Sequence, residues 1–259
     1  MSVAIVGAGP GDPGLVTVRA LELVRACEIL VYDRLVAPAL VAKATGAARI
    51  SRDGLTQEEV NELLVHHGRR GRAVVRLKGG DPFIFGRGFE EVEALAAAGI
   101  EYEVVPGISS FTAVPGLAGI PLTTRGVAAQ LTILTGMSGD GSDLDYRHLA
   151  ATPGTLVIFM GLKRLEELAD NLILAGRPVD EPAAVVSRLS SPDAQTRVGT
   201  LGTIAAVARD LRTPSLIVIG DVVASSAQLR VAIEHASSMA PSTPERSPSA
   251  GRTISGSDT

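Results

Sequence analysis

Short apolar runs alternate with longer amphipathic stretches in the first part of the chain. The apolar runs predict buried strands at residues 3–7, 29–32, 73–77 and 101–105. Apolar positions at helical spacing predict helices at residues 15–26, 57–67 and 89–98. Such alternation is typical of a parallel sheet with helices on its faces. We therefore predict an α/β domain with a mainly parallel sheet over residues 1–117.

The pattern changes in the second part of the chain. Proline and glycine residues from 115 to 121 predict a linker. The pattern then predicts strands at 130–135, 155–159, 183–187 and 215–220, a helix at 165–175, a turn and a helix within 199–211, and a polar loop at 137–145. Because strands and helices alternate less strictly here, we expect a second α/β domain with a mixed sheet over residues 118–237. Residues 238–259 hold too few apolar side chains to offset the entropy of ordering, which predicts a disordered tail.

Helix ends are marked by particular residues. Thr56 is suited to cap the start of the second predicted helix, because its hydroxyl can accept a backbone hydrogen bond. Gly99 and Gly176 each follow a predicted helix, where glycine commonly ends the helical conformation.

Composition limits the class of protein. Of the 259 residues, 46% are hydrophobic but only 3% are aromatic, so the core must be built from Ala, Val, Leu and Ile. The net charge of −4 gives no support for nucleic-acid binding by bulk charge. The single cysteine, Cys27, excludes an internal disulfide, and no spacing of ligand residues indicates a metal site. With no signal peptide and no long apolar run, we expect a cytoplasmic protein without membrane contact.

The loop over residues 79–88 is the most informative segment of the chain. It follows a predicted buried strand, and ligands bind at the carboxyl ends of strands in open α/β sheets. Gly79 and Gly80 allow a ligand to approach the backbone closely, and Asp81 is held extended by the proline that follows it. Arg87 and Glu90 place a cation and a carboxylate one helical turn apart. Such a loop indicates a binding site, although the last two residues would also form an ordinary surface ion pair.

Polar residues follow two other predicted strands. Asp33 comes directly after the second predicted strand. Its carboxylate could face a ligand at the end of the sheet, pair with Arg34 on the surface, or cap a helix. Ser109 and Ser110 follow the fourth strand, where their hydroxyls can cap a helix or contact a ligand. The residues alone leave these alternatives open.

The turn over residues 7–12 has the glycines of a dinucleotide-binding fingerprint but not its last position. That fingerprint needs glycine or alanine where this chain has Asp12. Pro10 also removes a backbone N–H that a pyrophosphate would use. We therefore reject a nicotinamide-dependent oxidoreductase.

Four blocks, in order, resemble the tetrapyrrole methylase family, and the central one resembles the signature of its uroporphyrinogen-III C-methyltransferases. They are the opening strand and turn (VGAGPGDP, 6–13), VYDRLV (31–36), GGDPFIFGRG (79–88) and VPGISS (105–110) running on to GIPLTTR (119–125). The resemblance extends from about residue 2 to 223. It implies two α/β domains with a ligand cleft between them, and a homodimer.

The resemblance also implies a reaction and a set of site residues. The methyl donor would be S-adenosyl-L-methionine, no metal would be needed, and uroporphyrinogen III would be methylated at C2 and C7 to precorrin-2, for sirohaem or cobalamin synthesis. Asp33 resembles the proposed proton acceptor, with Arg87 and Glu90 beside the substrate, and Arg87, Arg125 and Arg34 would bind substrate carboxylates. The cofactor would contact Pro10, Gly79, Gly80, Asp81, Ile84, Ser109, Ser110, Met160 and Leu189.

One segment departs from the family pattern. Before the second helix the family usually has a Gly-Lys-Arg-x-Gly-x-His run, and here residues 48–56 are several residues shorter. The lysine proposed as proton donor in relatives has no counterpart. Arg52 is the nearest cation, but arginine stays protonated and is a poor acid. This departure leaves open a binding protein without turnover. A methylase of a later precorrin is a second alternative, although the run FIFGRG (83–88) argues against it.

Overall fold

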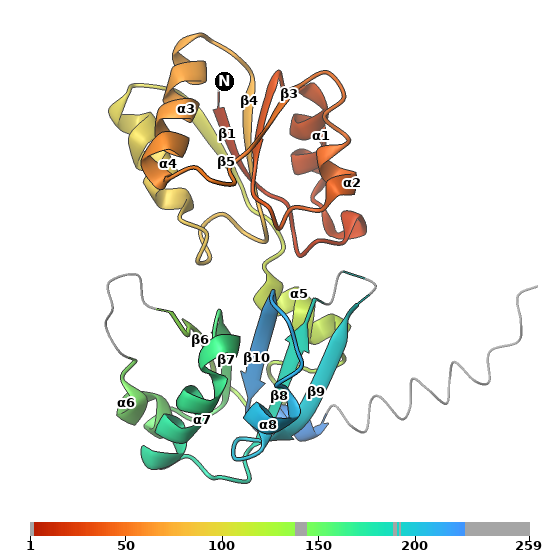
Figure 1. The fold of residues 1–259 in the computed structure, drawn as a ribbon, viewed down its shortest axis with the longest axis vertical. Helices are drawn as coiled ribbons and strands as arrows, with labels where there is room; N and C mark the ends of the chain where they lie inside the picture. The colour runs from red at the N-terminus through yellow and green to blue at the C-terminus, as the bar shows by residue number, and fades with distance from the viewer. Residues whose placement is uncertain (1–2, 138–143, 189–190, 192, 226–259) are drawn as a thin grey trace, which may run out of the picture.

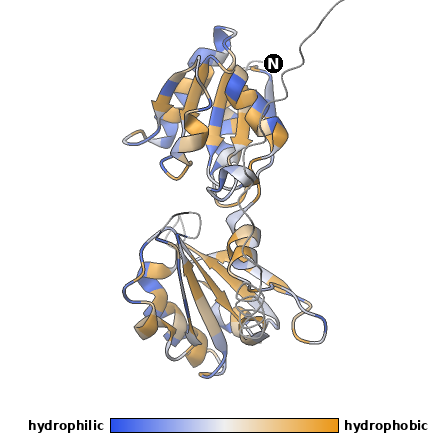
Figure 2. Ribbon diagram, turned by 90° about the vertical axis from the view of Figure 1, so that its right-hand side faces the viewer, coloured by the Kyte–Doolittle hydropathy of each residue, from blue (hydrophilic) through white to orange (hydrophobic). Residues whose placement is uncertain are grey.

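The computed structural model describes residues 3–137, 144–188, 191 and 193–225. The chain forms two lobes, each built around a five-stranded sheet (Figure 1). The strands of both lobes are mostly hydrophobic, as expected of sheets covered on both faces (Figure 2). The predicted tail and Leu189 lie outside the described residues.

The first sheet is entirely parallel, as its pattern predicts. Its strands are β1 (Val3–Gly7), β2 (Ile29–Tyr32), β3 (Ala48–Ser51), β4 (Val74–Lys78) and β5 (Tyr102–Val105), in the order β3-β2-β4-β1-β5. Since parallel strands end on the same side, all five carboxyl ends share one edge. That edge faces the second lobe (Figure 1).

Helices cover both faces of the first sheet. One face carries α1 (Val18–Ala26), α2 (Pro38–Val41) and a short 3₁₀ helix, η1 (Pro13–Leu15), and the other carries α3 (Gln57–Arg69) and α4 (Gly88–Ala97). The glycine turn after β1 leads into η1, and α1 begins only at Val18. The start of α1 is therefore not at the glycine turn, as a dinucleotide fold requires, which agrees with the rejection of that class.

The second sheet is mixed, which confirms the prediction. It contains β6 (Leu131–Thr135), β7 (Thr155–Phe159), β8 (Pro182–Ser187), β9 (Gln195–Thr200) and β10 (Ser215–Ile219), in the order β6-β7-β10-β8-β9. β6 and β7 pair parallel, and the other pairs are antiparallel. One face packs against α6 (Tyr146–Ala151), α7 (Leu165–Leu174) and α8 (Ile204–Val207), with the 3₁₀ helix η2 (Leu162–Arg164) leading into α7.

Helix α5 (Ser110–Leu117) covers the other face of the second sheet. It includes Pro115, so the expected linker over 115–121 begins within the last turns of a helix. The prediction misread these residues because proline and glycine usually mark a break, whereas here Val114 packs on the sheet and holds the helix in place. The boundary between residues 117 and 118 stays a prediction.

Candidate active site

The carboxyl edge of the first sheet brings together the loops that the sequence singles out. The turn after β1 and the loop after β4 are joined by two backbone hydrogen bonds. Gly80 N–H donates to the Gly9 carbonyl at 2.7 Å, and Gly9 N–H donates to the Gly80 carbonyl at 3.2 Å. Pro10, which follows directly, is half-buried. The residues predicted to hold a cofactor from these two loops are therefore neighbours.

Two glycines at this edge, Gly7 and Gly107, are required by the packing of the fold itself. A Cβ atom on Gly107 would lie 2.1 Å from the Gly80 carbonyl oxygen, and one on Gly7 would lie 2.5 Å from the Gly107 Cα. Three backbone segments thus cross without room for side chains. Gly79 differs, because a Cβ there would meet its nearest neighbour, Leu35 Cβ, at an ordinary 3.6 Å. Packing therefore does not explain the glycine at this position, whereas close approach of a ligand to the backbone would.

Asp81 holds the central loop against the segment after β5. Its Oδ1 accepts from the Phe83 N–H at 2.9 Å, and its Oδ2 accepts from the Gly107 N–H at 3.1 Å. A carboxylate oxygen has a further lone pair, so Asp81 can still accept a hydrogen bond from a ligand.

Ser109 and Ser110 stand at the start of α5, next to the central loop. A Cβ on Gly80 would lie 3.7 Å from Ser110 N. Ser109 is the buried N-cap residue, but its side chain makes no capping hydrogen bond. The first N–H groups of a helix lack intrahelical partners, so the start of α5 offers donors at this edge.

Asp33 is held by an arginine that the sequence reading did not single out. Its Oδ1 accepts from Arg76 Nη2 at 2.5 Å, and its side chain is 24% exposed. Of the alternatives left open by the sequence, a surface pair with Arg34 is not formed, and Arg34 is exposed. Asp33 therefore lies at the carboxyl edge of the first sheet, with its side chain partly exposed to solvent.

Behind Asp33 lies a buried ion cluster, which we define as Arg76, Lys78 and Glu91. Glu91 Oε1 accepts from Arg76 Nε at 2.9 Å and from Lys78 Nζ at 2.8 Å. Burial, followed by the nearby charge of Arg76, lowers the pKa of Lys78. A signal was present in the sequence, because charged residues at 76 and 78 lie on one face of a strand that is covered on both sides. Such charges must find partners inside the protein.

Arg87 and Glu90 form the ion pair that their spacing allows. Arg87 Nε and Nη2 donate to the two Glu90 carboxylate oxygens at 2.8 and 2.6 Å, and both side chains are about half exposed. The hydrogen bond from Arg87 lowers the pKa of Glu90, which makes this carboxylate a weaker base. The geometry thus favours an electrostatic role for the pair over proton abstraction.

The two lobes meet at the central loop. The rings of Phe85 and Phe159 lie 5.1 Å apart, so the loop after β4 contacts the end of β7 in the second lobe. Ile84 is partly exposed at 36%, and Met160, the residue after Phe159, at 46%. Phe85, Arg87 and Met160 all have positive φ angles, near 50–58°. Non-glycine residues in this conformation are strained and concentrate at functional sites, which strengthens the assignment of this region.

The remaining predicted residues are not joined to this group by any described contact. Arg125 is exposed in the turn closed by Thr124 and Ala128, and it makes no hydrogen bond or ion pair within the described part of the chain. Arg52, directly after β3, donates to the Leu55 carbonyl at 3.1 Å. Arg52 therefore lies at the same carboxyl edge of the sheet, but its guanidinium is already bonded to the Leu55 carbonyl.

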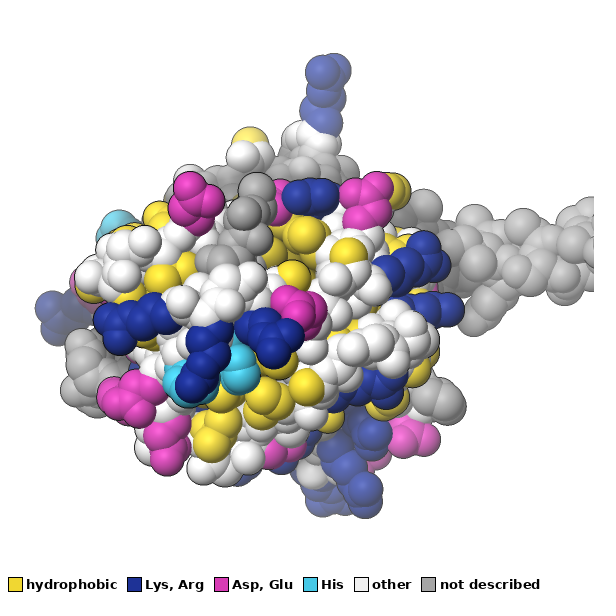
Figure 3. All heavy atoms as spheres, turned by 90° about the horizontal axis from the view of Figure 1, so that it is seen from above, with side chains coloured by type: hydrophobic (Ala, Val, Ile, Leu, Met, Phe, Trp, Pro, Cys, Tyr) yellow, Lys and Arg dark blue, Asp and Glu magenta, His cyan; other side chains and the backbone are white. Residues whose placement is uncertain are grey.

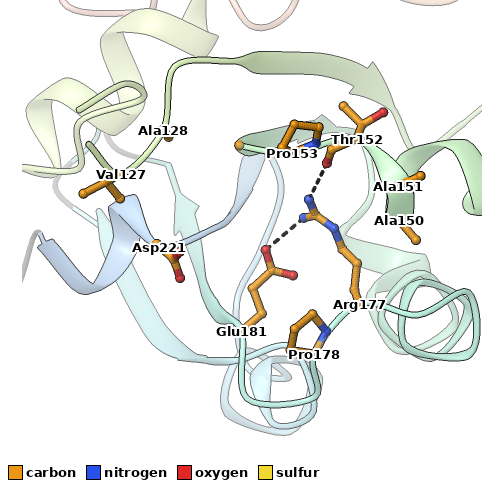
Figure 4. Close-up of a pocket in the computed structure, with 11 residues that line it drawn as sticks. Val127, Ala128, Ala150, Ala151, Thr152, Pro153, Arg177, Pro178, Glu181 and Asp221 are labelled. Atoms are coloured by element: carbon orange, nitrogen blue, oxygen red, sulfur yellow. Dashed lines mark hydrogen bonds and ion pairs between the residues drawn. The ribbon is translucent and has the colours of Figure 1, made fainter. Parts of the chain in front are cut away.

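Two cavities lie away from this edge. One, of about 310 Å³, is in the second lobe, where Arg177 bonds Glu181 and the Thr152 carbonyl (Figure 4). The other, of about 440 Å³, lies beside α3, where its lining includes His66, Arg69 and Arg70. On the face seen from above, His side chains lie next to several Lys or Arg side chains (Figure 3). Neither cavity contains a predicted site residue.

Comparison with known proteins decides the family. The model for tetrapyrrole (corrin/porphyrin) methylases matches residues 2–205. The chain belongs to the tetrapyrrole methylase family. It is 44% identical over 233 residues to an S-adenosyl-L-methionine-dependent uroporphyrinogen III methyltransferase of Methanosarcina barkeri, covering 85% of this chain and 91% of that protein.

A solved structure of another tetrapyrrole methylase has the same fold. It is the uroporphyrin-III C-methyltransferase of Thermus thermophilus in complex with S-adenosylhomocysteine, with 38% identity and a TM-score of 0.77 over 87% of this chain and all of that one. Siroheme synthase 1 of Yersinia enterocolitica is 44% identical over 85% of this chain. The chain spans about half the length of the siroheme synthases that it matches, 48% in that case.

Two further findings concern metal-binding groups and membrane-spanning helices. Among the described residues, no group of three or more His, Cys, Asp or Glu side chains is arranged to hold a metal ion. Within the same residues, no helix is long and apolar enough to cross a membrane.

Proposed function

We propose that this chain transfers two methyl groups from S-adenosyl-L-methionine to C2 and C7 of uroporphyrinogen III, giving precorrin-2 and two molecules of S-adenosylhomocysteine. The observation that carries the proposal is the convergence of the four motif loops at one sheet edge, where packing does not explain the glycine at position 79. The near full-length match to a uroporphyrinogen III methyltransferase supports the substrate.

The cofactor would lie along the backbone of Gly79, Gly80 and Asp81, beside Pro10 and the start of α5. Ser109 and Ser110 would contribute donors there, and Ile84, Met160 and Leu189 apolar or backbone contacts. The bound cofactor supplies a methyl group that is already activated as a sulfonium. The chain therefore has no need of a covalent intermediate, and its task is to align the pyrrole carbon with the methyl group.

The substrate carries eight carboxylates, so arginine forks are suitable partners. Arg34 and Arg125 would bind them directly, since neither side chain is engaged within the described residues. Arg87 would act with Glu90 as an orienting pair. Asp33 would accept the proton that the methylated ring loses. Its carboxylate is partly exposed at the carboxyl edge of the sheet, and the bond from Arg76 holds it in place. No residue here needs to replace the family lysine for that step.

The test is an anaerobic incubation of the purified chain with uroporphyrinogen III and S-adenosyl-L-methionine, with the tetrapyrrole analysed by mass spectrometry. We expect a gain of two methyl groups and two S-adenosylhomocysteines per ring. No gain on uroporphyrinogen III, but methylation of a later precorrin, would identify the alternative substrate. Cofactor binding without any transfer would identify a binding protein.

We also propose that the chain acts as a homodimer in the cytoplasm. The support is the family alone. Light scattering on the purified protein tests the first part, since a mass of one chain at micromolar concentration would contradict it.

A further inference from the structure

The buried ion cluster is more elaborate than strand packing requires. The side chains of Arg76 and Glu91 are fully buried, and that of Lys78 is 2% exposed. Burying charges costs several kcal/mol per ion unless geometry and hydrogen bonds offset it. A methylase lobe with apolar residues at these positions would avoid that cost, so the cluster calls for a functional explanation.

The buried ion cluster makes one bond to a partly exposed carboxylate, that of Asp33. The Arg76 guanidinium bonds Glu91 through Nε at 2.9 Å and Asp33 through Nη2 at 2.5 Å. Lys78 Nζ and Gln57 Nε2 hold the same Glu91 oxygen at 2.8 and 3.4 Å. Arg76 is thus fixed from behind and presents the other arm of its fork to Asp33.

The charges of the cluster are balanced only together with Asp33. Arg76 and Lys78 bring two positive charges, and Glu91 brings one negative charge. The Asp33 carboxylate makes the sum zero, and of these four groups it alone is substantially exposed. The hydrogen bond from Arg76 Nη2 restricts the orientation of the Asp33 carboxylate.

We propose that Arg76 is a positioning residue for Asp33, and that Glu91 and Lys78 fix Arg76 in that role. This inference rests on the proposed function, in which Asp33 accepts a proton. An arginine is needed because only a planar fork bonds two carboxylates in fixed directions, whereas a lysine is a point charge. Misplacing a catalytic group by about 1 Å costs on the order of 10²-fold in rate.

The experiment is a double-variant cycle on the methylation rate of the full chain. Arg76→Lys keeps the charge but removes the fork, and we expect kcat to fall by about 10²-fold with the KM for S-adenosyl-L-methionine nearly unchanged. Asp33→Asn alone should lower kcat by about 10²–10⁴-fold. If Arg76 acts through Asp33, adding Arg76→Lys to Asp33→Asn causes little further loss.

A matched control comes from the second lobe. Arg177 is also buried and paired, with Glu181 at 3.0 Å, but it lies away from the candidate site. Arg177→Lys should lower the melting temperature and leave kcat unchanged. If Arg76→Lys does not fold, Glu91→Gln replaces it in the cycle, because it leaves both Arg76 and Asp33 in place.

The outcomes separate this inference from the function. Losses that multiply in the double variant, or a full kcat in Arg76→Lys, overturn the positioning role while the proposed function stands. No methyl transfer by the unmodified chain overturns both.

Discussion

At the scale of single residues, two positions at the carboxyl edge of the first sheet hold glycine for different reasons. Gly107 has no room for a Cβ, whereas Gly79 does. We expect Gly107→Ala to destabilise the protein by about 1–3 kcal/mol through overpacking. Gly79→Ala should leave the melting temperature nearly unchanged but weaken cofactor binding about tenfold, or ~1.4 kcal/mol.

Calorimetric titration with S-adenosylhomocysteine and thermal unfolding measure both effects. Gly46→Ala is the control, because a Cβ there meets nothing within 4 Å and the residue lies outside the site. Unchanged affinity in Gly79→Ala would show that the cofactor does not use this space.

Lys78 gives a prediction about pH. Burial lowers its pKa below the usual 10.5, so between the lowered value and 10.5 the unfolded chain binds a proton that the folded chain does not. Stability contributed by this residue therefore rises with pH in that window. Urea unfolding of wild type and Lys78→Met from pH 8 to about 10.5 should show a difference that shifts in favour of wild type as pH increases. Lys43→Met, at an exposed lysine, controls for the loss of a surface charge. A difference independent of pH would mean that Lys78 stays charged throughout.

At the scale of elements, α3 is the helix with the most complete cap. Thr56 Oγ1 accepts from the Glu59 N–H at 3.2 Å, and the Thr56 N–H donates to Glu59 Oε2 at 2.7 Å. Thr56→Ala should cost about 1 kcal/mol in urea unfolding. Thr17 caps α1 through one bond only, at 3.2 Å, so Thr17→Ala should cost less. Equal losses would indicate that the reciprocal bond contributes nothing.

The accuracy of the strand prediction follows how apolar each strand is. Central strands such as β7 (Thr155–Phe159) were predicted to the residue, because burial on both faces demands a continuous apolar run. The two missed strands, β3 and β9, are both sheet edges and contain polar residues. An edge strand can lack such a run, as these two do, whereas the edge strands β5 and β6 keep mostly apolar residues and are predicted from the sequence.

The candidate site was predictable in the same uneven way. Its loops were found because glycine and proline motifs are local in sequence. The sequence does not reveal the buried ion cluster, because Arg76 and Glu91 meet only when α4 packs on β4. In addition, the apolar pattern of residues 73–77 predicts a buried strand without drawing attention to the charge of Arg76. The sequence also does not predict how far Arg34 and Arg125 lie from the other site residues, because the loops that carry them are placed only by the packing of the two lobes.

At the scale of the whole molecule, each lobe has a separate task. The parallel sheet gathers its loops at one edge because all its strands run in the same direction. The mixed sheet brings Phe159 and Met160 to that edge, where Phe159 contacts Phe85. We therefore propose that the methyl donor binds between the lobes, and not in the cavity of the second lobe or in the one beside α3.

The most direct test of that claim is a crystal structure of the chain grown with S-adenosylhomocysteine. We predict that the ligand lies against Gly79, Gly80 and Asp81, with Met160 of the second lobe beside it. Ligand found instead in the cavity lined by Arg177 and Glu181, or beside α3, would contradict the central claim.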